Sequence, residues 1–274
     1  MIDVKSILLK SANTPLNPCA VLLSAGIDSS SVLFALLEAG KSVTAYSFCL
    51  EGHESRDVRY AEITAKEFGV PFVRINLPIS IDVLREDLID LVRFGAKKKT
   101  DFECGWPMLY AYQAIKEREI FSGMGADGHF CISKKGMMHY KNRIDEFRDM
   151  LFSNPSYGQE HIHRSLSAVY KKCWIAPYMT KDMIDAFKGS TWNEVNKPNQ
   201  KQPILDAFPE QFKRIKVFKH QNFQKGDSGI SDHFEKLLHT DLNVGNHKSV
   251  VGIYNYLVKN LSKEKDELLD IQHT

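Results

Sequence analysis

A short apolar run that leads through small and hydroxyl residues into a helical stretch constrains this chain most. Residues 20–23 (Ala-Val-Leu-Leu) have the length and apolar character of a buried strand. Residues 32–39 follow as a predicted helix, which Gly40 is well placed to end. The first turn of such a helix has unpaired N–H groups and the positive end of the helix dipole, so it attracts an anion. This order of elements predicts an anion site at residues 24–31.

The residue types in this loop indicate that the anion is a polyphosphate. Small residues let the backbone approach the phosphates, hydroxyl groups add donors, and Asp28 offers a carboxylate to the Mg²⁺ that accompanies a polyphosphate. No Gly-Lys-Ser/Thr follows, so the loop is not a Walker loop. A plainer interpretation is that Asp28 or Ser29 only caps the helix. The nucleotide interpretation predicts contacts from Ser24, Ala25, Gly26, Asp28, Ser29 and Ser30.

Length and composition are those of a globular protein. The chain has 274 residues, 43% of them hydrophobic and 26% charged, with a net charge of +2 that is too small to argue for a nucleic-acid partner. No apolar run approaches the roughly 18 residues of a membrane span, and the N-terminus lacks the pattern of a signal peptide. The five cysteines are scattered without a C-x-x-C pair, which argues against a disulfide framework and against zinc or iron–sulfur sites. We therefore expect a cytoplasmic protein.

Strand and helix patterns alternate through the first half of the chain. Alternation at this spacing predicts an α/β fold with a parallel sheet that is covered by helices on both faces. Residues 1–18 are expected to lead into the first strand. Strands are predicted at 42–50, 70–77 and 119–122, and helices at 54–68, 81–94 and 107–117.

The strand signal fades beyond about Lys141. The second half reads as helices at 142–152, 162–172, 181–187 and 234–238, separated by prolines. We expect an α/β domain over 1–140 and a mainly helical part over 141–274, which packs against the open edge of the sheet and completes the site. The boundary is soft, so the two parts can form one domain.

A second loop carries a carboxylate to the same edge of the sheet. Three glycines surround Asp127 directly after the strand 119–122. Taken alone, this is a common Gly-Asp turn. Ligands of parallel sheets collect at the carboxyl ends of the strands, where Asp28 is also expected. Together, Asp28 and Asp127 predict a Mg²⁺ site that neutralises pyrophosphate.

These motifs resemble a known enzyme family. The pattern Ser-x-Gly-x-Asp-Ser-Ser over 24–30 resembles the pyrophosphate loop of the N-type ATP pyrophosphatases, with Ala25 in the place of a glycine. Residues 122–127 resemble the Ser-Gly-Glu-Gly-(Ser/Ala)-Asp element of asparagine synthetase and the β-lactam synthetases. Looser matches follow at 176–179, 201–209 and 219–226. The resemblance runs from about residue 20 to 240 and implies an adenine-nucleotide α-hydrolase-like sheet.

The resemblance implies an ATP-dependent, AMP-forming ligase with Mg²⁺. Such an enzyme adenylates an acceptor carboxylate or amide-type oxygen and then forms an amide with ammonia or an amine. Asp127 and one late lysine, Lys219 or Lys225, would be catalytic. Lys201 can equally be a surface residue at a helix start. Adenine contacts are expected from Tyr46, Ser47, Phe48, Ser122 and Gly123.

The departures from the family pattern concern the acceptor. Gly128 and His129 replace an acidic and a bulky apolar residue, and Ile175 and Cys173 stand where Arg and Glu are expected. These surroundings handle the amino acid in asparagine synthetase, so the small-molecule acceptor is left open. Two alternatives remain: an ATP pyrophosphatase that modifies a tRNA or nucleotide base, and a non-catalytic nucleotide-binding protein. The missing C-x-x-C and the small net charge weigh against the first.

The nitrogen source and two side-chain groups complete the expectations. The loop already begins at Ser24, which leaves no room for the glutaminase domain with which the amidotransferases of this family start. We therefore expect free ammonia, an amine or a separate glutaminase partner, and the oligomeric state is left open. His161 and His163 are expected to be solvated or to cap a helix, and residues 106–112 to contribute core aromatics.

Overall fold

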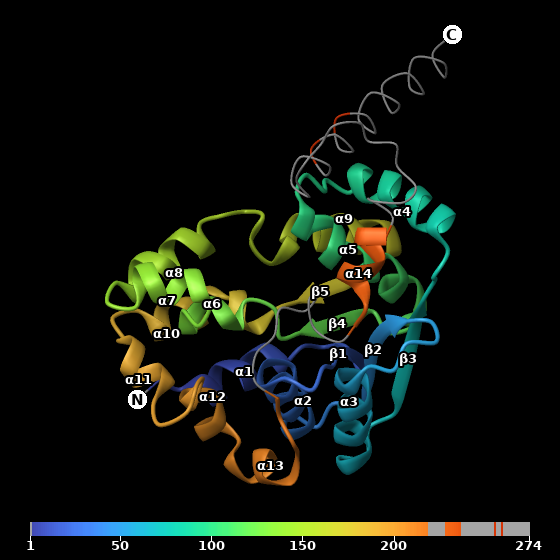
Figure 1. Ribbon diagram of the computed structural model, residues 1–274. Coiled ribbons are helices and arrows are strands. Elements are labelled where there is room, and N and C mark those ends of the chain that lie inside the picture. Colours follow the sequence, from blue (N-terminus) through green and yellow to red (C-terminus); the bar gives the residue numbers. More distant parts are fainter. Residues whose placement is uncertain (1, 219–227, 237–254, 256–258, 260–274) are drawn as a thin grey trace.

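The centre of the structure is a five-stranded sheet in the order β3-β2-β1-β4-β5, with every neighbouring pair parallel. This computed structural model describes residues 2–218, 228–236, 255 and 259 (Figure 1). The strands are β1 (Cys19–Leu22), β2 (Val43–Leu50), β3 (Phe72–Leu77), β4 (Glu119–Ser122) and β5 (Cys173–Ile175).

Helices connect these strands and cover the sheet on both faces, as the alternating pattern predicts. Figure 1 shows α1, α2 and α3 on one side of the strands and α4, α5, α9 and α14 on the other. The long helices are α1 (Val4–Ala12), α2 (Ile27–Glu38), α3 (Arg56–Glu67), α4 (Ile81–Arg93), α5 (Lys99–Ala114), α8 (Ile144–Phe152) and α9 (Glu160–Tyr170). The shorter ones are α6 (Ala126–Phe130), α7 (Lys134–Tyr140), η1 (Tyr157–Gln159), η2 (Pro177–Met179), α10 (Lys181–Phe187), α11 (Trp192–Asn196), α12 (Gln202–Ala207), α13 (Pro209–Arg214) and α14 (Ile230–Lys236).

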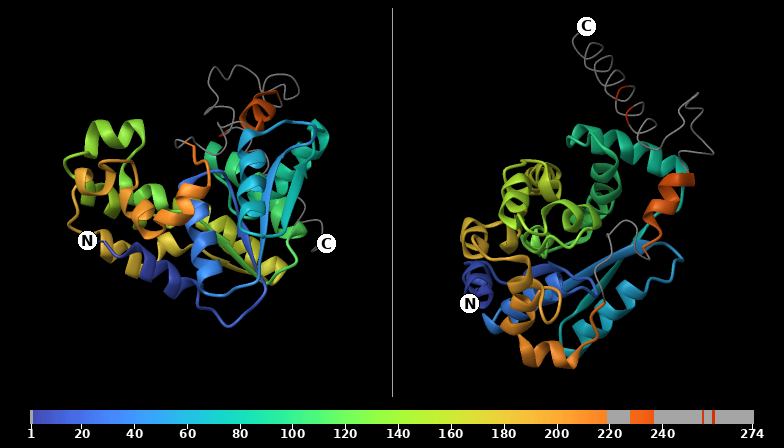
Figure 2. Two further views of the ribbon diagram at one scale, coloured as in Figure 1. Left: turned by 90° about the horizontal axis from the view of Figure 1, so that it is seen from below. Right: turned by 60° about the vertical axis from the view of Figure 1, so that its left-hand side comes forward.

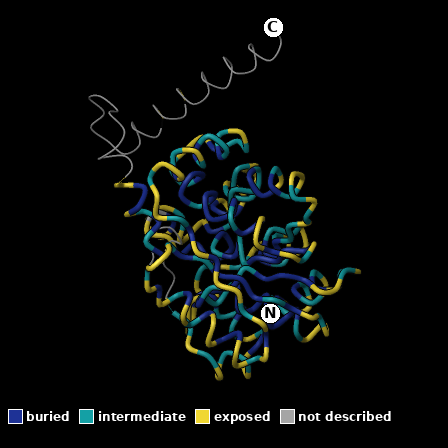
Figure 3. Tube along the Cα trace, turned by 90° about the vertical axis from the view of Figure 1, so that its right-hand side faces the viewer, coloured by how far each residue is buried: buried dark blue, intermediate teal, exposed yellow. Residues whose placement is uncertain are grey.

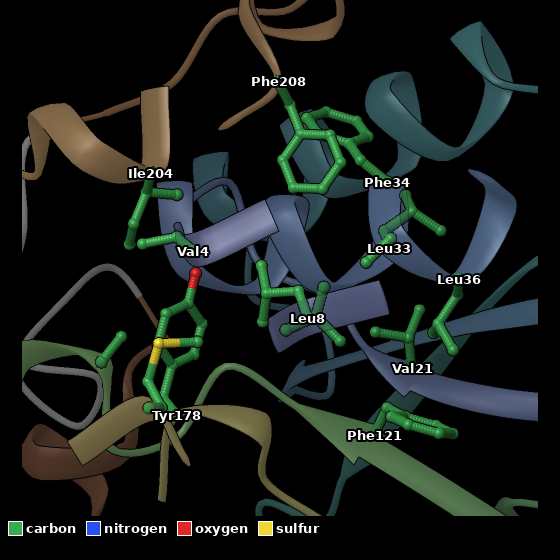
Figure 4. Packing of buried hydrophobic residues seen from close by; sticks show 14 of the residues in the cluster. Val4, Leu8, Val21, Leu33, Phe34, Leu36, Phe121, Tyr178, Ile204 and Phe208 are labelled. Carbon is green, nitrogen blue, oxygen red and sulfur yellow. The ribbon is translucent and has the colours of Figure 1, made fainter. Parts of the chain in front are cut away.

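The sheet separates two hydrophobic clusters because side chains alternate along its strands. On one face, Val21 and Phe121 pack with α1 and α2. On the other face, Ala20 and Ile120 pack with α4, α5 and α9. Figure 4 shows the first cluster, in which Ile204 and Phe208 from late in the sequence meet α1 and α2. Figure 3 shows the strands running through the buried middle of the molecule.

The second half of the chain supplies a strand that its sequence pattern does not reveal. β5 pairs with β4 in the register Glu119↔Cys173, so the expected helical packing at this edge is instead a strand pairing. Three residues are too few for an alternating pattern to be recognised. Figure 2 shows, from two further sides, that α7, α8, α10 and α11 gather on one side of the molecule.

Two helices also differ from the sequence expectation. Residues 4–12 form α1 instead of an extended lead-in, with Val4, Leu8 and Ala12 buried at helical spacing. α5 begins at Lys99, eight residues before the predicted start, and includes Pro107 within the helix. The short length of α1 and the proline in α5 hid both helices in the sequence.

The aromatic and histidine expectations have opposite outcomes. Trp106, Met108 and Tyr112 are buried in the second cluster, as predicted. The expectation for His163 is wrong: its ring is buried and stacks on Trp174 with the centroids 4.3 Å apart. Stacking and the 3.1 Å hydrogen bond between the His163 Nδ1 and the Tyr112 hydroxyl make a neutral histidine tolerable in the core. Within the described residues, no helix is long and apolar enough to cross a bilayer.

Removing the ring of Phe34 should test the first cluster. Phe34 is 1% exposed and its ring contacts those of Phe68, Phe208 and Phe212 at 4.9–5.8 Å between centroids. The Phe34 ring joins α2 to α13 and to Phe208, and Phe34→Ala leaves a cavity in its place. The free energy of unfolding should therefore fall by about 3–5 kcal/mol in urea denaturation. Ile63→Ala, at a side chain 47% exposed on α3, should change it by less than about 0.5 kcal/mol. Equal losses in the two variants would contradict this account of the core.

Candidate active site

The strand order brings the two predicted loops together. β1 lies between β2 and β4, so the chain leaves the sheet in opposite directions on its two sides. Parallel sheets bind their ligands at the carboxyl ends of strands at such a point. The loop after β4 rests directly on the first turn of α2. A Cβ atom on Gly123 would lie 2.6 Å from the Ser29 nitrogen and 2.7 Å from the Asp28 carbonyl carbon. Only glycine permits this approach of the two backbones.

The loop after β1 is held by its own hydroxyl groups. The Ser24 and Ser29 hydroxyl oxygens lie 2.9 Å apart, and the Ser30 hydroxyl donates to the Gly26 carbonyl at 2.8 Å. Gly26 is the N-cap of α2 and has no side chain with which to cap it. The positive end of a 12-residue helix therefore lies at the carboxyl end of β1 without a side-chain cap, as an anion site requires.

Lys201 is the side chain that unites the site. Its Nζ lies 2.8 and 2.6 Å from the two carboxylate oxygens of Asp28 and 2.6 Å from Oδ1 of Asp127. The residue is 4% exposed and its backbone is left-handed, with φ +62°. The expectation of a possible surface lysine is therefore wrong, because the two carboxylates offset the cost of burying the ammonium group.

The charge of Lys201 follows from two opposing effects. Burial lowers the pKa of this lysine, but the carboxylates of Asp28 and Asp127 outweigh burial and raise the pKa above its ordinary value. The ammonium group is consequently charged at neutral pH. One positive charge is thus fixed between two negative ones at the N-terminus of α2.

The two carboxylates fit a magnesium ion. Asp28 and Asp127 converge on one cation, and carboxylate oxygens are the ligands Mg²⁺ prefers. Among the described residues no group of three or more His, Cys, Asp or Glu side chains is arranged to hold a metal. Mg²⁺ commonly takes one or two carboxylates together with substrate phosphates, so this small donor set suits a metal that arrives with a nucleotide.

A buried polar network links α2 and α6, the two helices that carry the carboxylates. The Tyr178 hydroxyl lies 2.6 Å from the Ser31 hydroxyl on α2, and the Tyr178 carbonyl accepts from Nε2 of His129 at 2.7 Å. His129 lies two residues after Asp127 and stacks on Phe152 and Phe187 at 4.5 Å. Since a carbonyl only accepts, the His129 proton must be on Nε2. Burial lowers the pKa of His129 to about 3, so the ring is neutral.

The side chains expected to contact adenine are hydrogen-bonded to other residues or buried. The Tyr46 hydroxyl donates to Glu117 at 2.8 Å, and the Ser122 hydroxyl accepts from Trp174 Nε1 at 3.1 Å. Ser47 is buried, and Phe48 packs against the second cluster. Backbone groups are what these positions can offer to a base.

Gly128, one of the departures from the family pattern, lies next to Tyr157. A Cβ atom on Gly128 would lie 2.6 Å from the Tyr157 hydroxyl, so Tyr157 fills the space beside the position where an acidic residue is expected. Burial raises the pKa of Tyr157, and Asp127 and Asp28 raise it further. Cys173 is exposed on β5. Tyr157 is therefore a neutral group beside the carboxylates.

Sequence patterns assigned no role in the site to Lys201 or Tyr178, and they leave two predicted residues untested. The available signals were the loose family matches at 201–209 and 176–179, which contain these two residues. The predicted Lys219 and Lys225 lie outside the described residues.

Removing the Lys201 charge should destabilise the protein in a pH-dependent way. Lys201→Met leaves the Asp28 and Asp127 carboxylates without their shared cation, and we expect a loss of about 1–3 kcal/mol at pH 7, reduced from the fully buried case because both carboxylates reach solvent. The loss should be smaller in acid than at pH 7, because a neutral carboxyl group needs no partner cation. Lys213→Met, at an exposed pair with Glu210, serves as the control and should have almost no effect. A loss independent of pH would contradict the ion bridge.

The buried His129 should make stability fall with acid. Its folded pKa of about 3 is below the unfolded value near 6.5, so the unfolded state binds the extra proton, and stability present above pH 6.5 is lost as pH falls toward 3. His129→Phe should reduce the slope of unfolding free energy against pH by about 1.4 kcal/mol per unit between pH 4 and 6. His163→Phe should do the same, since burial also lowers the pKa of His163 to about 3. Unchanged slopes in both variants would contradict the assignment.

Comparisons with known proteins agree with the motifs. The model of the family described as asparagine synthase matches residues 10–249. A tRNA-specific 2-thiouridylase MnmA from Fervidobacterium nodosum is 28% identical over 167 residues, which is 53% of this chain. The chain spans about half the length of this curated relative, 46%.

Two solved structures cover most of the chain at low sequence identity. The first is described as a predicted subunit of tRNA methyltransferase from Methanocaldococcus jannaschii; it is 16% identical with a TM-score of 0.36, over 77% of this chain and 97% of that one. The second, NMN synthetase from Francisella tularensis, is 13% identical with a TM-score of 0.34, over 80% of this chain and 99% of that one.

Proposed function

The chain belongs to the asparagine synthase family, and we propose on that premise that this ATP-utilising enzyme is an AMP-forming ligase. The observation that carries the proposal is the Lys201 bridge between Asp28 and Asp127 at the open N-terminus of α2. This arrangement offers carboxylates for a metal, a fixed cation and a helix dipole at one point. These are the groups that a departing pyrophosphate requires.

The proposed first step is transfer of an adenylyl group. An oxygen of the acceptor, a carboxylate or amide-type oxygen, forms a bond to the α-phosphorus of ATP. The bond from that phosphorus to the α–β bridging oxygen breaks, and pyrophosphate leaves with the electron pair. The N-terminus of α2 and the Ser24 and Ser29 hydroxyls are placed to bind it. Mg²⁺ held by Asp28 and Asp127 would neutralise phosphate charge.

The proposed second step forms the amide. The nitrogen of ammonia or an amine attacks the adenylated carbon and gives up a proton to solvent, the carbon–oxygen bond to AMP breaks, and AMP leaves with the electron pair. An adenylated carboxylate gives an amide in this step, whereas an adenylated amide gives an amidine. We propose free ammonia, an amine or ammonia from a separate glutaminase as the source. The acceptor stays open, and the neutral Tyr157 beside Gly128 supports an acceptor other than aspartate.

We assign the charge-neutralising role to Lys201. Its ammonium group is buried and already lies at the two carboxylates, so little reorganisation is needed when charge develops on the bridging oxygen. Lys219 and Lys225 stay predictions for the same role. Comparing the three lysine-to-alanine variants would decide between them: the variant with a loss of about 10²–10³ in kcat identifies the catalytic cation.

Base modification in tRNA is the second candidate. The observation in its favour is the 28% identity to a protein named as a tRNA-specific 2-thiouridylase. The net charge of +2 and the absence of a C-x-x-C pair weigh against it. A third alternative, nucleotide binding without catalysis, fits poorly with a site that keeps both carboxylates and a cation.

Turnover should yield AMP and pyrophosphate, never ADP. Asp28→Asn and Asp127→Asn should each lower the rate at least about 10²-fold, because each removes a charge from the proposed metal site. Asp206→Asn, at an exposed carboxylate on α12, is the matched control and should keep full activity. Product analysis with ammonium, candidate acceptors and tRNA in separate reactions measures this. Accumulation of ADP, or normal turnover by both site variants, would contradict the proposal that the enzyme is an AMP-forming ligase.

A further inference from the structure

Other parts of the chain bind both main-chain polar groups of Ala25, a residue of the phosphate loop. Its N–H donates to Oδ1 of Asp57 at 2.8 Å, and its carbonyl accepts from the Phe218 N–H at 3.3 Å. Ala25 is 2% exposed. A buried residue whose N–H and carbonyl are both hydrogen-bonded has little freedom to change its backbone conformation. The loop conformation therefore depends on residues outside the loop.

Asp57 is well placed to remain a carboxylate acceptor. It lies in the first turn of α3, where the helix dipole favours negative charge, and Ser55 caps that helix. Its hydrogen bond to Ala25 joins an ionised acceptor to a backbone donor, which is among the stronger kinds. α3 is thereby tied to the loop that follows β1.

The Phe218 side chain packs against α3, the helix that carries Asp57. Its ring lies 4.7 Å from that of Tyr60, edge to face, and the Arg56 guanidinium lies 5.5 Å from the ring centroid. α3 thus provides the carboxylate that binds the Ala25 N–H and the surface that positions the Phe218 N–H.

We propose that Asp57 is a positioning residue that fixes the phosphate loop through the Ala25 N–H. This proposal rests on the proposed nucleotide chemistry for its consequence, but the positioning itself does not require it. The consequence is that Ala25 gives its N–H to Asp57 and not to phosphate. Phosphate binding then falls to the first turn of α2, which Gly26 leaves without a side-chain cap.

Two substitutions separate hydrogen bonding from charge. Asp57→Ala removes the acceptor, whereas Asp57→Asn keeps an amide oxygen at the same place and removes the charge. Glu62→Gln, at an exposed carboxylate on the same helix, is the control for the general loss of one negative charge. All are made in the full chain.

Hydrogen exchange of the Ala25 amide is the first readout. Exchange in Asp57→Ala should accelerate about tenfold or more, as expected for the loss of one hydrogen bond to a charged group, while the Val21 amide in β1 is unchanged. Asp57→Asn should stay within about threefold of the wild type. Unaltered exchange in Asp57→Ala would overturn the proposal, as would equally fast exchange in Asp57→Asn. If Asp57→Ala unfolds and the Val21 amide accelerates too, the Asp57→Asn result decides.

Calorimetric binding of inorganic pyrophosphate with Mg²⁺ is the second readout. Asp57→Ala should bind about tenfold more weakly, Asp57→Asn within about threefold of the wild type, and Glu62→Gln unchanged. Tighter binding by Asp57→Ala would mean that the carboxylate competes with phosphate, and it would overturn the proposal. If the wild type binds no pyrophosphate, the proposed function fails, while the exchange experiment still decides the role of Asp57.

Discussion

One buried ammonium group, that of Lys201, joins residues from both halves of the sequence in a single site. Lys201 comes from the start of α12, Asp28 from α2 and Asp127 from α6, and the Lys201–Asp28 pair spans 173 positions of sequence. Neither carboxylate would be favourable so close to the other without a cation between them, and the lysine would not be buried without them. The ion bridge of Lys201 therefore fixes the relative positions of α2, α6 and α12 and also sets the charge between them.

Sequence patterns located the loops of the site but not the side chain between them. Strand, loop and helix around Gly26, and the glycines before Asp127, are local signals, and both carboxylates lie where these signals place them. Lys201 has no local signal, because a buried lysine and a surface lysine look alike until their distant partners are known. β5 was missed for a related reason: a three-residue strand is defined by its pairing with β4, not by its own pattern.

The family assignment explains some features of the site, and the geometry adds others that the family motifs do not include. Membership of the asparagine synthase family accounts for the loop at α2 and the carboxylates that follow β1 and β4. The surroundings of Asp127 are not accounted for by the family motifs: Gly128 leaves room for the Tyr157 hydroxyl, and His129 donates from Nε2 to the Tyr178 carbonyl. Shared motifs with different surroundings allow one fold to serve different functions.

One side of α1 is covered by residues that come much later in the sequence. Val4 and Leu8 of α1 share a cluster with Ile204 and Phe208 (Figure 4). The Lys5 ammonium lies 5.5 Å from the centroid of the Phe208 ring. At roughly 5–20 residues per second, a ribosome needs about 10–40 seconds to add the roughly 200 residues between them. Throughout that time Val4 and Leu8 lack the part of their cover that Ile204 and Phe208 provide, so this hydrophobic cluster is completed only late in synthesis.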